Sequence, residues 1–531
     1  MRDFSKRQCL VIDDFQGMRT LLRDMLRELG VARVDIAANG NEATGLLGGH
    51  RYDVVLCDYN LGNGRNGQQL LEEAKLRNLV GPACVWIMVT AEKTSEAILG
   101  AVEYQPDAYL IKPVTIATLE NRLEKLWARK SALLEIDSAL AAKNYSRALQ
   151  LCEQRLEFDR INAAELQRLK SQILVNAGDW SAAQQVFQQV LDERELPWAK
   201  TGMAKVLFQQ GQFDAARDML QQTIEDNRSY LEAYDWLALA QQKLGDDAGA
   251  EQTLQAALKL FPKSPLRQKN LGELALKRGD SETAAQAFSK SVEVGEFSVL
   301  KSADAYVGLA QVCGPAQEKE AMKALDLLQK HLPGDETRLR AKSVAGIIYQ
   351  QANNPKKAAE MAAEVSQLLQ AGVLPPGNNA SLETASLLLA NGDRDGAVAL
   401  LQSVVRNNHD NKDLLGQVQQ VFVDSGMAEE GARLVEASRQ EAIEIMNRGV
   451  LLAREGRLQE ALDAMYQART SLPGNVRVLF NFAFILIGYM QKNGASDNLR
   501  TDARNALLQA NRLEPGDKRF TQLMDALTQL S

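Results

Sequence analysis

Glycine recurs at a nearly constant interval through most of this 531-residue chain. One series, spaced by 33, 34 and 34 residues, comprises Gly178, Gly211, Gly245 and Gly279. A second series, spaced by 34 and 30 residues, comprises Gly392, Gly426 and Gly456. A fixed period of this length is typical of helix–turn–helix solenoids, because one unit cannot bury its apolar face without its neighbours. We therefore expect most of the chain beyond about residue 130 to be an all-α solenoid.

The residues around these glycines repeat as well. Five residues after six of the glycines stands an alanine: Ala183, Ala216, Ala250, Ala284, Ala397 and Ala461. Four residues further on stands a large apolar residue: Phe187, Leu220, Leu254, Phe288, Leu401 and Met465. Seven residues before each glycine stands a small residue: Ser171, Ala204, Ala238, Gly272, Ala385 and Gly449. This pattern resembles the tetratricopeptide repeat (TPR), in which small residues let paired helices approach closely.

The repeat pattern predicts how the chain is divided. The segment around Asn353 and Ala358 fits the pattern with asparagine in place of the turn glycine. Degenerate helix pairs are expected at residues 131–163, 301–333, 412–438 and 476–515, the last with an insertion near 493–498, followed by a capping helix at 519–530. The expected domains are 1–129, a helical junction or degenerate first repeat at 130–163, repeats at 164–300, partly degenerate repeats at 301–438, and repeats with the cap at 439–531.

The N-terminal segment has a different pattern. Short apolar runs at residues 9–12, 34–38, 54–57, 85–89 and 109–111 alternate with helical patterns at 17–29, 40–47, 67–76, 95–102 and 116–127. Strands that alternate with helices and are apolar throughout favour a parallel sheet covered on both faces. We expect a doubly wound α/β domain, in which ligands bind beyond the carboxyl ends of the strands.

Acidic residues follow two of these predicted strands. Asp13 and Asp14 come after the first strand and Asp58 after the third, so all three carboxylates are expected at one edge of the sheet. Each pair would repel by about 4 kcal/mol at 4 Å. Mg²⁺, which prefers oxygen ligands, removes that cost. Thr90 and Lys112 end the fourth and fifth strands and add a hydroxyl and an ammonium group at this edge.

In order and spacing, these residues resemble the receiver domain of bacterial response regulators. The resemblance implies a five-stranded sheet of order 2-1-3-4-5, with Asp58 as the phosphoacceptor. It implies that Asp13, Asp14, Asp58 and the backbone carbonyl of Asn60 hold Mg²⁺. It also implies that Lys112 pairs with a phosphoryl oxygen and that Thr90 bonds the phosphoryl group once it is present.

Three further expectations come from the same resemblance. Tyr109 matches the aromatic switch position, which turns inward as the threonine moves. Asn60 and Glu92 match positions that tune hydrolysis of the acyl phosphate, and this combination predicts a short-lived phosphoryl group. Where receivers usually have Met-Pro after the acceptor, this chain has Leu61-Gly62 and a glycine-rich run to Gly67. We expect that loop to be longer and more mobile than usual.

Composition excludes several other classes of protein. The net charge of −7, without a cluster of basic residues, argues against nucleic-acid binding. Five cysteines without C-x-x-C spacing and three distant histidines argue against a disulfide framework or a zinc site. The most apolar stretch, residues 478–490, is too short to span a bilayer and is expected to form a buried helix. The N-terminus lacks the pattern of a signal peptide, so a cytoplasmic protein is expected.

These observations lead to one functional hypothesis and two rivals. We expect a non-enzymatic response regulator, in which a sensor histidine kinase phosphorylates Asp58 and the concave TPR surface binds a protein partner. Helical spacing of leucines across residues 118–142 predicts that the last receiver helix runs into, or docks on, the first repeat helix. The first rival is a constitutive TPR scaffold whose receiver is only a docking module. The second, an enzyme or transcription factor, lacks a second reactive cluster or a basic recognition helix.

Overall fold

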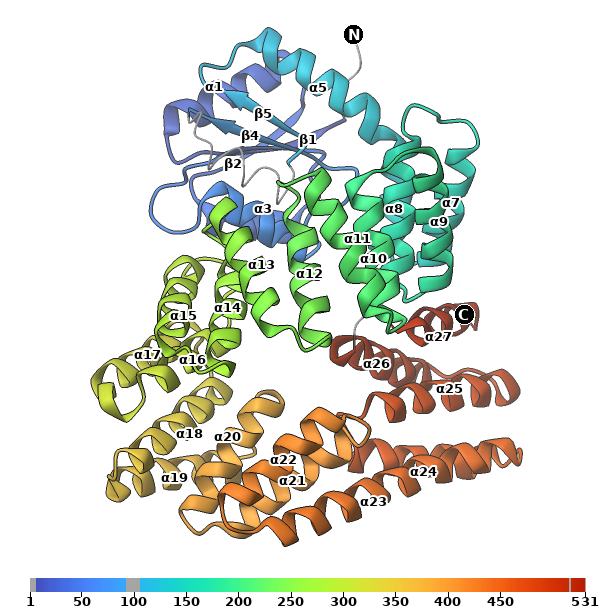
Figure 1. The fold of residues 1–531 in the computed structure, drawn as a ribbon. Helices are drawn as coiled ribbons and strands as arrows, with labels where there is room; N and C mark the ends of the chain where they lie inside the picture. Colours follow the sequence, from blue (N-terminus) through green and yellow to red (C-terminus); the bar gives the residue numbers. More distant parts are fainter. Residues whose placement is uncertain (1–5, 92–105, 515–516, 531) are drawn as a thin grey trace. The chain divides into compact units, whose positions relative to one another are not determined.

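The computed structural model describes residues 6–91, 106–514 and 517–530 (Figure 1). The chain divides into two compact units. The first comprises Met1–Leu174, Trp180–Asp280 and Lys290–Ser302. The second comprises Val175–Asp179, Ser281–Ser289 and Ala303–Ser531. Each unit is described by itself below.

The N-terminal part of the first unit is a five-stranded sheet of order β2-β1-β3-β4-β5, in which every pair is parallel. Its strands are β1 (Gln8–Ile12), β2 (Arg33–Ala37), β3 (Val54–Asp58), β4 (Val85–Thr90) and β5 (Ala108–Ile111). β3 and β4 are buried along their whole length, as expected for central strands covered on both faces. The predicted fold class and strand order are confirmed.

Helices cover both faces of this sheet (Figure 1). On one face, α1 (Gln16–Glu28) and α5 (Ile116–Lys130) pack their leucines against alternate residues of the strands, among them Val11, Leu56 and Ile87. On the other face, α2 (Gly40–Gly49) and α3 (Gly67–Leu76) cover the intervening residues, such as Leu10 and Val55. The helix predicted at residues 95–102 lies outside the described residues.

Helix α5 continues almost directly into the repeats. After Lys130 come the 3₁₀ turn Ser131–Leu133 and α6 (Leu134–Ala141), and both Ser131 and Leu134 keep right-handed helical dihedrals. Leu133 and Ile136 enter the same core as Leu166 of the first clear repeat. The predicted continuity between receiver and array is confirmed.

Antiparallel helix pairs make up the rest of the chain. The helices with most or all of their residues in the first unit are α7 (Tyr145–Leu156), α8 (Ala163–Asn176), α9 (Trp180–Glu193), α10 (Pro197–Gln209), α11 (Phe213–Asp226), α12 (Leu231–Lys243), α13 (Asp247–Leu260) and α14 (Pro265–Lys277). Helix α15 (Ser281–Gly295) has residues in both units. The second unit contains α16 (Ala303–Cys313), α17 (Glu318–His331), α18 (Asp335–Gln351), α19 (Pro355–Gln370), α20 (Gly377–Ala390), α21 (Arg394–Asn407), α22 (Lys412–Asp424), α23 (Ala428–Arg454), α24 (Leu458–Ser471), α25 (Val476–Asn493), α26 (Asp497–Leu513) and α27 (Lys518–Gln529).

The repeat positions have the roles that the sequence pattern predicts. The seven periodic glycines have positive φ, and Asn353, with φ of 55°, takes the same left-handed turn. The six alanines are fully buried. A Cβ on Gly449 would overlap the side chain of Met465, so close helix approach requires glycine there. Lys143, with φ of 56°, marks a turn between α6 and α7 that the glycine period does not reveal.

Two predicted boundaries in the C-terminal repeats are wrong. The division between residues 438 and 439 falls inside α23, a continuous helix of 27 residues. The extra residues predicted as an insertion near 493–498 instead lengthen α25 and α26 to 18 and 17 residues around a short turn. At residues 438–439 the helical pattern continues without Pro or Gly, so α23 extends through the predicted division. At the other place Gly494, with φ of 90°, ends α25. The apolar stretch at 478–490 is a buried helix, as predicted.

One histidine in the second unit is expected to make stability depend on pH. His409 is 4% exposed, and its Nδ1 lies 3.1 Å from Asn475 Nδ2. That amide also donates to the Arg406 carbonyl, and Asn475 Oδ1 accepts from Val478 N, so Nδ1 must be an acceptor. Burial lowers the pKa of His409, and the neighbouring charges are Asp410, which raises it, and Arg477 and Arg439, which lower it.

The depressed pKa fixes the sign of this prediction. Stability is present above the unfolded pKa of about 6.5 and is lost as pH falls through the folded value. Thermal unfolding followed across this range is expected to show a loss of about 1 kcal/mol, the size of one hydrogen bond. The variant His409→Gln should remove this acid sensitivity, whereas His50→Gln, at an exposed site, should retain it. Equal acid sensitivity in both variants would contradict the prediction.

Among the described residues, no helix is long and apolar enough to cross a membrane. Four of the five cysteines are buried and Cys313 is half-buried. Burial raises the pKa of the Cys9 thiol to about 12 and that of Cys152 to about 11. These side chains act as small apolar groups, as predicted.

Candidate functional site

Three carboxylates meet at the carboxyl ends of β1 and β3. The two strands are neighbours in register, which places Asp13 and Asp14 beside Asp58. One oxygen from each lies within 4.8 Å of the others. Asp13 is 0% and Asp58 8% exposed, whereas Asp14 is exposed. The predicted cluster is thus assembled, and its oxygen-only donor set fits a divalent cation such as Mg²⁺.

Lys112 lies at the centre of this cluster. Its Nζ is 2.9 Å from Asp13 Oδ2 and 2.9 Å from Asp58 Oδ2. Burial alone would lower the pKa of Lys112, but the bonds to the two carboxylates raise it above its ordinary value. Burial raises the pKa of the Asp58 carboxyl, while Lys112 opposes that effect. The ammonium group therefore offsets crowding of negative charge in a site largely withdrawn from water.

Thr90 and Tyr109 lie on the two strands next to the cluster. Thr90 ends β4 and is buried, and its carbonyl accepts a hydrogen bond of 2.9 Å from Lys112 N. Tyr109, on β5, is half-buried against the core that contains Met88 and Trp86. Burial, with a smaller contribution from Tyr59, raises the pKa of the Tyr109 phenol to about 12. Their bonding and switching roles stay predictions.

Side chains fasten the end of the loop that follows Asp58. Arg65 forms an ion pair with Glu73 and donates to Asn41 Oδ1 at 2.7 Å and Thr44 Oγ1 at 3.2 Å. Asn66 and Gln69 form a reciprocal capping box at the start of α3. These bonds tie residues 65–67 to α2 and α3, and the greater mobility of the loop stays a prediction. The role of Arg65 could not be predicted from the sequence, because an isolated arginine in a glycine-rich run carries no periodic signal.

Gly67 closes this loop against the phosphoacceptor position. Its amide donates to the Tyr59 carbonyl at 2.8 Å, and a Cβ here would overlap the backbone oxygen of Asp58.

Arg19, a second residue whose role the sequence does not reveal, holds the segment that contains Asp13 and Asp14. Its Nη1 donates to the carbonyls of Asp13 at 2.6 Å and Asp14 at 2.9 Å.

The two predicted rate-tuning residues are less well placed. Asn60 is exposed in the loop after β3, and neither its carbonyl ligation nor its tuning role is tested. Glu92 lies outside the described residues. Within the described chain, the Asp13–Asp14–Asp58 group is the one cluster of His, Cys, Asp or Glu close enough to hold a metal ion.

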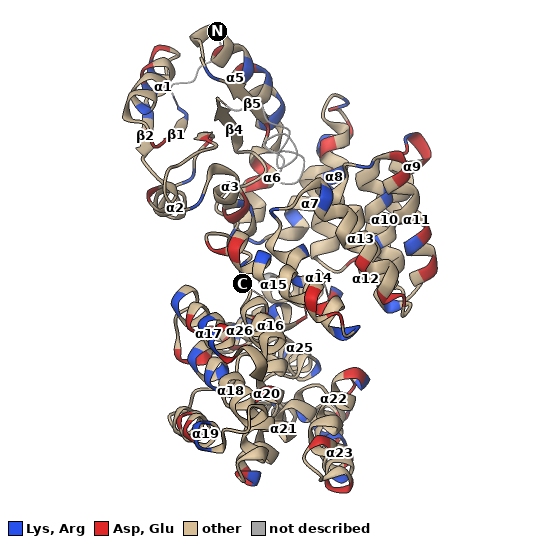
Figure 2. Cartoon of the chain, turned by 60° about the vertical axis from the view of Figure 1, so that its left-hand side comes forward, with Lys and Arg blue, Asp and Glu red and all other residues tan. Residues whose placement is uncertain are grey.

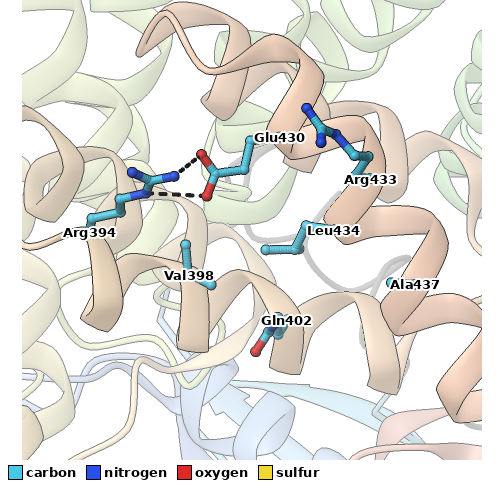
Figure 3. Close-up of a pocket in the computed structure, with 7 residues that line it drawn as sticks. All are labelled: Arg394, Val398, Gln402, Glu430, Arg433, Leu434 and Ala437. Carbon is cyan, nitrogen blue, oxygen red and sulfur yellow. Dashed lines mark hydrogen bonds and ion pairs between the residues drawn. The ribbon is translucent and has the colours of Figure 1, made fainter.

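A groove in the second unit is lined by α21 and α23 (Figure 3). Val398, Leu434 and Ala437 contribute apolar surface to it. At one end Arg394 and Glu430 pair with each other. A second arginine, Arg433, also lines the groove and pairs with Glu429 of the same helix.

The sheet order and the lysine-bridged acidic pocket define an α/β receiver domain. The response regulator receiver domain model matches residues 9–124, and a tetratricopeptide repeat model matches residues 201–265. Chemotaxis protein CheY-3 of Vibrio cholerae is 33% identical over 120 residues, which cover 23% of this chain and 91% of that protein. Chemotaxis protein CheY of Pseudomonas aeruginosa is 31% identical, covering 23% and 95%. The chain belongs to the response regulator receiver family and joins its receiver to a tetratricopeptide region.

Two solved structures are similar to parts of this chain. A CheY-like receiver from Methanospirillum hungatei is 26% identical and covers 24% of this chain and 96% of its own, with a TM-score of 0.22. The structure titled MamA RS-1 ArsTM double mutant is 24% identical and covers 31% and 93%, with a TM-score of 0.28.

Proposed function

We propose that this protein is a phosphorylation-controlled response regulator whose repeats bind a protein partner. Asp58 accepts a phosphoryl group from a sensor histidine kinase, and the receiver then changes state. The observation that carries the proposal is the bridging of Asp13 and Asp58 by Lys112 at 2.9 Å in a pocket of three carboxylates. An ammonium group in this position can pair with the carboxylate before the reaction and with an incoming phosphoryl oxygen during it.

The chain's own residues account for most of the proposed chemistry. A carboxylate oxygen of Asp58 attacks phosphorus, the bond from phosphorus to the donor breaks, and an acyl phosphate forms. Lys112 neutralises the charge on one phosphoryl oxygen, and the Thr90 hydroxyl donates a hydrogen bond to a second phosphoryl oxygen. Mg²⁺, held by Asp13, Asp14, Asp58 and the Asn60 carbonyl, would supply charge neutralisation at the phosphoryl oxygens. Tyr109 turns inward as Thr90 moves.

The repeats supply recognition rather than catalysis in this proposal. Acidic and basic residues alternate along the described repeat helices (Figure 2), which favours a protein partner over nucleic acid. The concave TPR surface takes an extended peptide or a helix. The protein is proposed to be non-enzymatic and to work in the cytoplasm, away from the membrane.

Dependence on Mg²⁺ tests the proposed chemistry. Incubation with a small acyl phosphate and Mg²⁺ should add one phosphoryl mass to the intact chain. Chelation with EDTA leaves three crowded carboxylates without their counter-charge, and Asp13→Asn removes one of the proposed metal ligands. Each change is expected to reduce the rate by at least about 100-fold. Intact-mass spectrometry over time measures this rate. Phosphorylation that proceeds equally in EDTA would contradict the role given to the acidic pocket.

The lifetime of the acyl phosphate is the subject of a separate prediction. If Asn60 and Glu92 tune hydrolysis as the family resemblance implies, the phosphoryl group should decay quickly after the donor is removed. Substitution of both residues by apolar side chains is expected to slow the decay by about tenfold. Loss of phosphoryl mass with time is the measurement, and slow decay in the natural chain would rule this prediction out.

A further inference from the structure

Helix α3 of the receiver buries two glutamates on its outer side. Leu70, Leu71 and Ala74 pack on the sheet, as an amphipathic helix requires. The adjacent Glu72 and Glu73 are nevertheless only 2% and 5% exposed. Charged side chains are seldom buried unless other groups cover and bond them. Something besides the sheet must therefore pack on this helix.

The cover for Glu72 comes from the repeat array, 226 residues further along the chain. Ser298 Oγ donates to Glu72 Oε2 at 3.0 Å, and both side chains are buried. Ser298 belongs to the turn after α15, whose backbone is fixed by bonds from Leu300 N to Ser298 Oγ and from Ser298 N to the Gly295 carbonyl, each 3.0 Å. The turn is thus shaped to present one hydroxyl to α3.

The same helix is tied to the phosphoacceptor loop. It begins at Gly67, which lies against the Asp58 carbonyl, and Glu72 follows after little more than one helical turn. Arg65, in the loop, pairs with Glu73 next to Glu72. Burial and then the charge of Arg65 lower the pKa of Lys301, which belongs to the repeat turn. A movement of the loop after Asp58 would therefore be transmitted to the Glu72–Ser298 hydrogen bond through a short series of contacts.

A second attachment of receiver to repeats lies at the other end of the sheet. Lys130 Nζ donates to the Pro82 carbonyl at 2.8 Å and pairs with Asp107 at 3.0 Å. Ala83, just before β4, shares a core with Leu133 and Ile136. Pro82, Ala83 and Asp107 precede the amino ends of β4 and β5, whereas Asp58 is at the carboxyl end of β3. This attachment, polar at Lys130 and apolar around Ala83, can hold the receiver and the repeats together whatever the state of the acidic pocket.

We propose that the α3 face is the receiver's output surface, that its partner is residues 296–301 of the chain's own repeat array, and that phosphorylation of Asp58 opens the Glu72–Ser298 contact. The Glu72–Ser298 contact belongs, in this proposal, to the unphosphorylated chain, and phosphorylation can act on it only by favouring a state in which the contact is open. The attachment around Lys130 remains and acts as the pivot. This inference rests on the proposed function, since it needs Asp58 to be phosphorylated.

Hydrogen exchange of the full chain tests the proposal, with Mg²⁺ and beryllofluoride as a stable phosphoryl mimic. The mimic should slow exchange at the ends of β4 and β5 and speed it about five- to tenfold at residues 296–301 and in α3. Without the mimic, Ser298→Ala should speed exchange at the same two segments and leave the rate of phosphorylation unchanged. The matched control Ser289→Ala, at an exposed position of α15, should do neither.

The experiment separates a failure of the proposed Glu72–Ser298 opening from a failure of the proposed function. If the mimic protects β4 and β5 while hydrogen exchange at residues 296–301 stays the same or slows, the proposed opening of the Glu72–Ser298 contact is wrong. The proposed role of the phosphoacceptor pocket is then unaffected. If the mimic protects neither strand, the proposed function is wrong. If Ser298→Ala leaves both segments unchanged in the absence of the mimic, the contact does not hold α3 and the proposal is overturned.

Discussion

Asp58→Asn is expected to lose phosphoryl incorporation by more than about a thousandfold, because an amide oxygen cannot replace the carboxylate nucleophile. The fold should persist. Asn has the same shape as Asp, and Asp58 carries its charge in a buried site beside Asp13, where a neutral group relieves repulsion. Lys112 keeps its 2.9 Å bond to Asp13. Thermal stability is therefore expected to be equal to or above that of the natural chain.

The control for this variant is Asp24→Asn, an exposed acid on α1 that pairs with Arg23. It should retain full phosphorylation. Partner capture from native cell extract, with and without the phosphoryl mimic, should respond to the mimic in Asp24→Asn and fail to respond in Asp58→Asn. Equal capture by the natural chain and Asp58→Asn under both conditions would favour the rival hypothesis of a constitutive scaffold. Phosphorylation of Asp58→Asn at the natural rate would exclude Asp58 as the acceptor.

The sequence predicted the parts of the site that depend on strand ends. Parallel strands deliver their carboxyl-terminal residues to one edge, so Asp13, Asp58 and Lys112 could be placed together without coordinates. The same holds for the repeats, where Asn353 was expected in a turn and adopts the positive φ of the glycines. In both cases a periodic or topological rule constrains the position.

Contacts between residues far apart in sequence could not be predicted in this way. Arg65 reaches Asn41 and Thr44 on α2, and Ser298 reaches Glu72, through side-chain geometry that leaves no period in the sequence. The predicted division at residue 438 falls within the long helix α23, whose length the repeat period does not reveal. Helix ends depend on local capping and on packing, and a repeat length constrains them only weakly.

Gly67→Ala is expected to have the second largest effect, because the site has no room for one methyl group. Its Cβ would overlap the backbone oxygen of Asp58 and would lie 2.9 Å from Cys57 Sγ. Since the obstacle is backbone, the end of β3 and the start of α3 must separate. We expect a loss of about 2–3 kcal/mol from the receiver, typical of overpacking a tight site, together with slower phosphorylation because Asp58 moves relative to Lys112.

The matched control is Gly45→Ala in α2, an exposed helical position where a Cβ would meet nothing within 4 Å. Alanine there should stabilise the receiver by about 0.5–1 kcal/mol through helix propensity. Hydrogen exchange of β3 and β4 in the full chain reports receiver stability without interference from the repeats. A Gly67→Ala variant with natural exchange in β3 and natural phosphorylation would show that the Asp58 loop can yield to α3. In that case the segment that connects Asp58 through Gly67 to Glu72 would be too flexible to transmit a change of state.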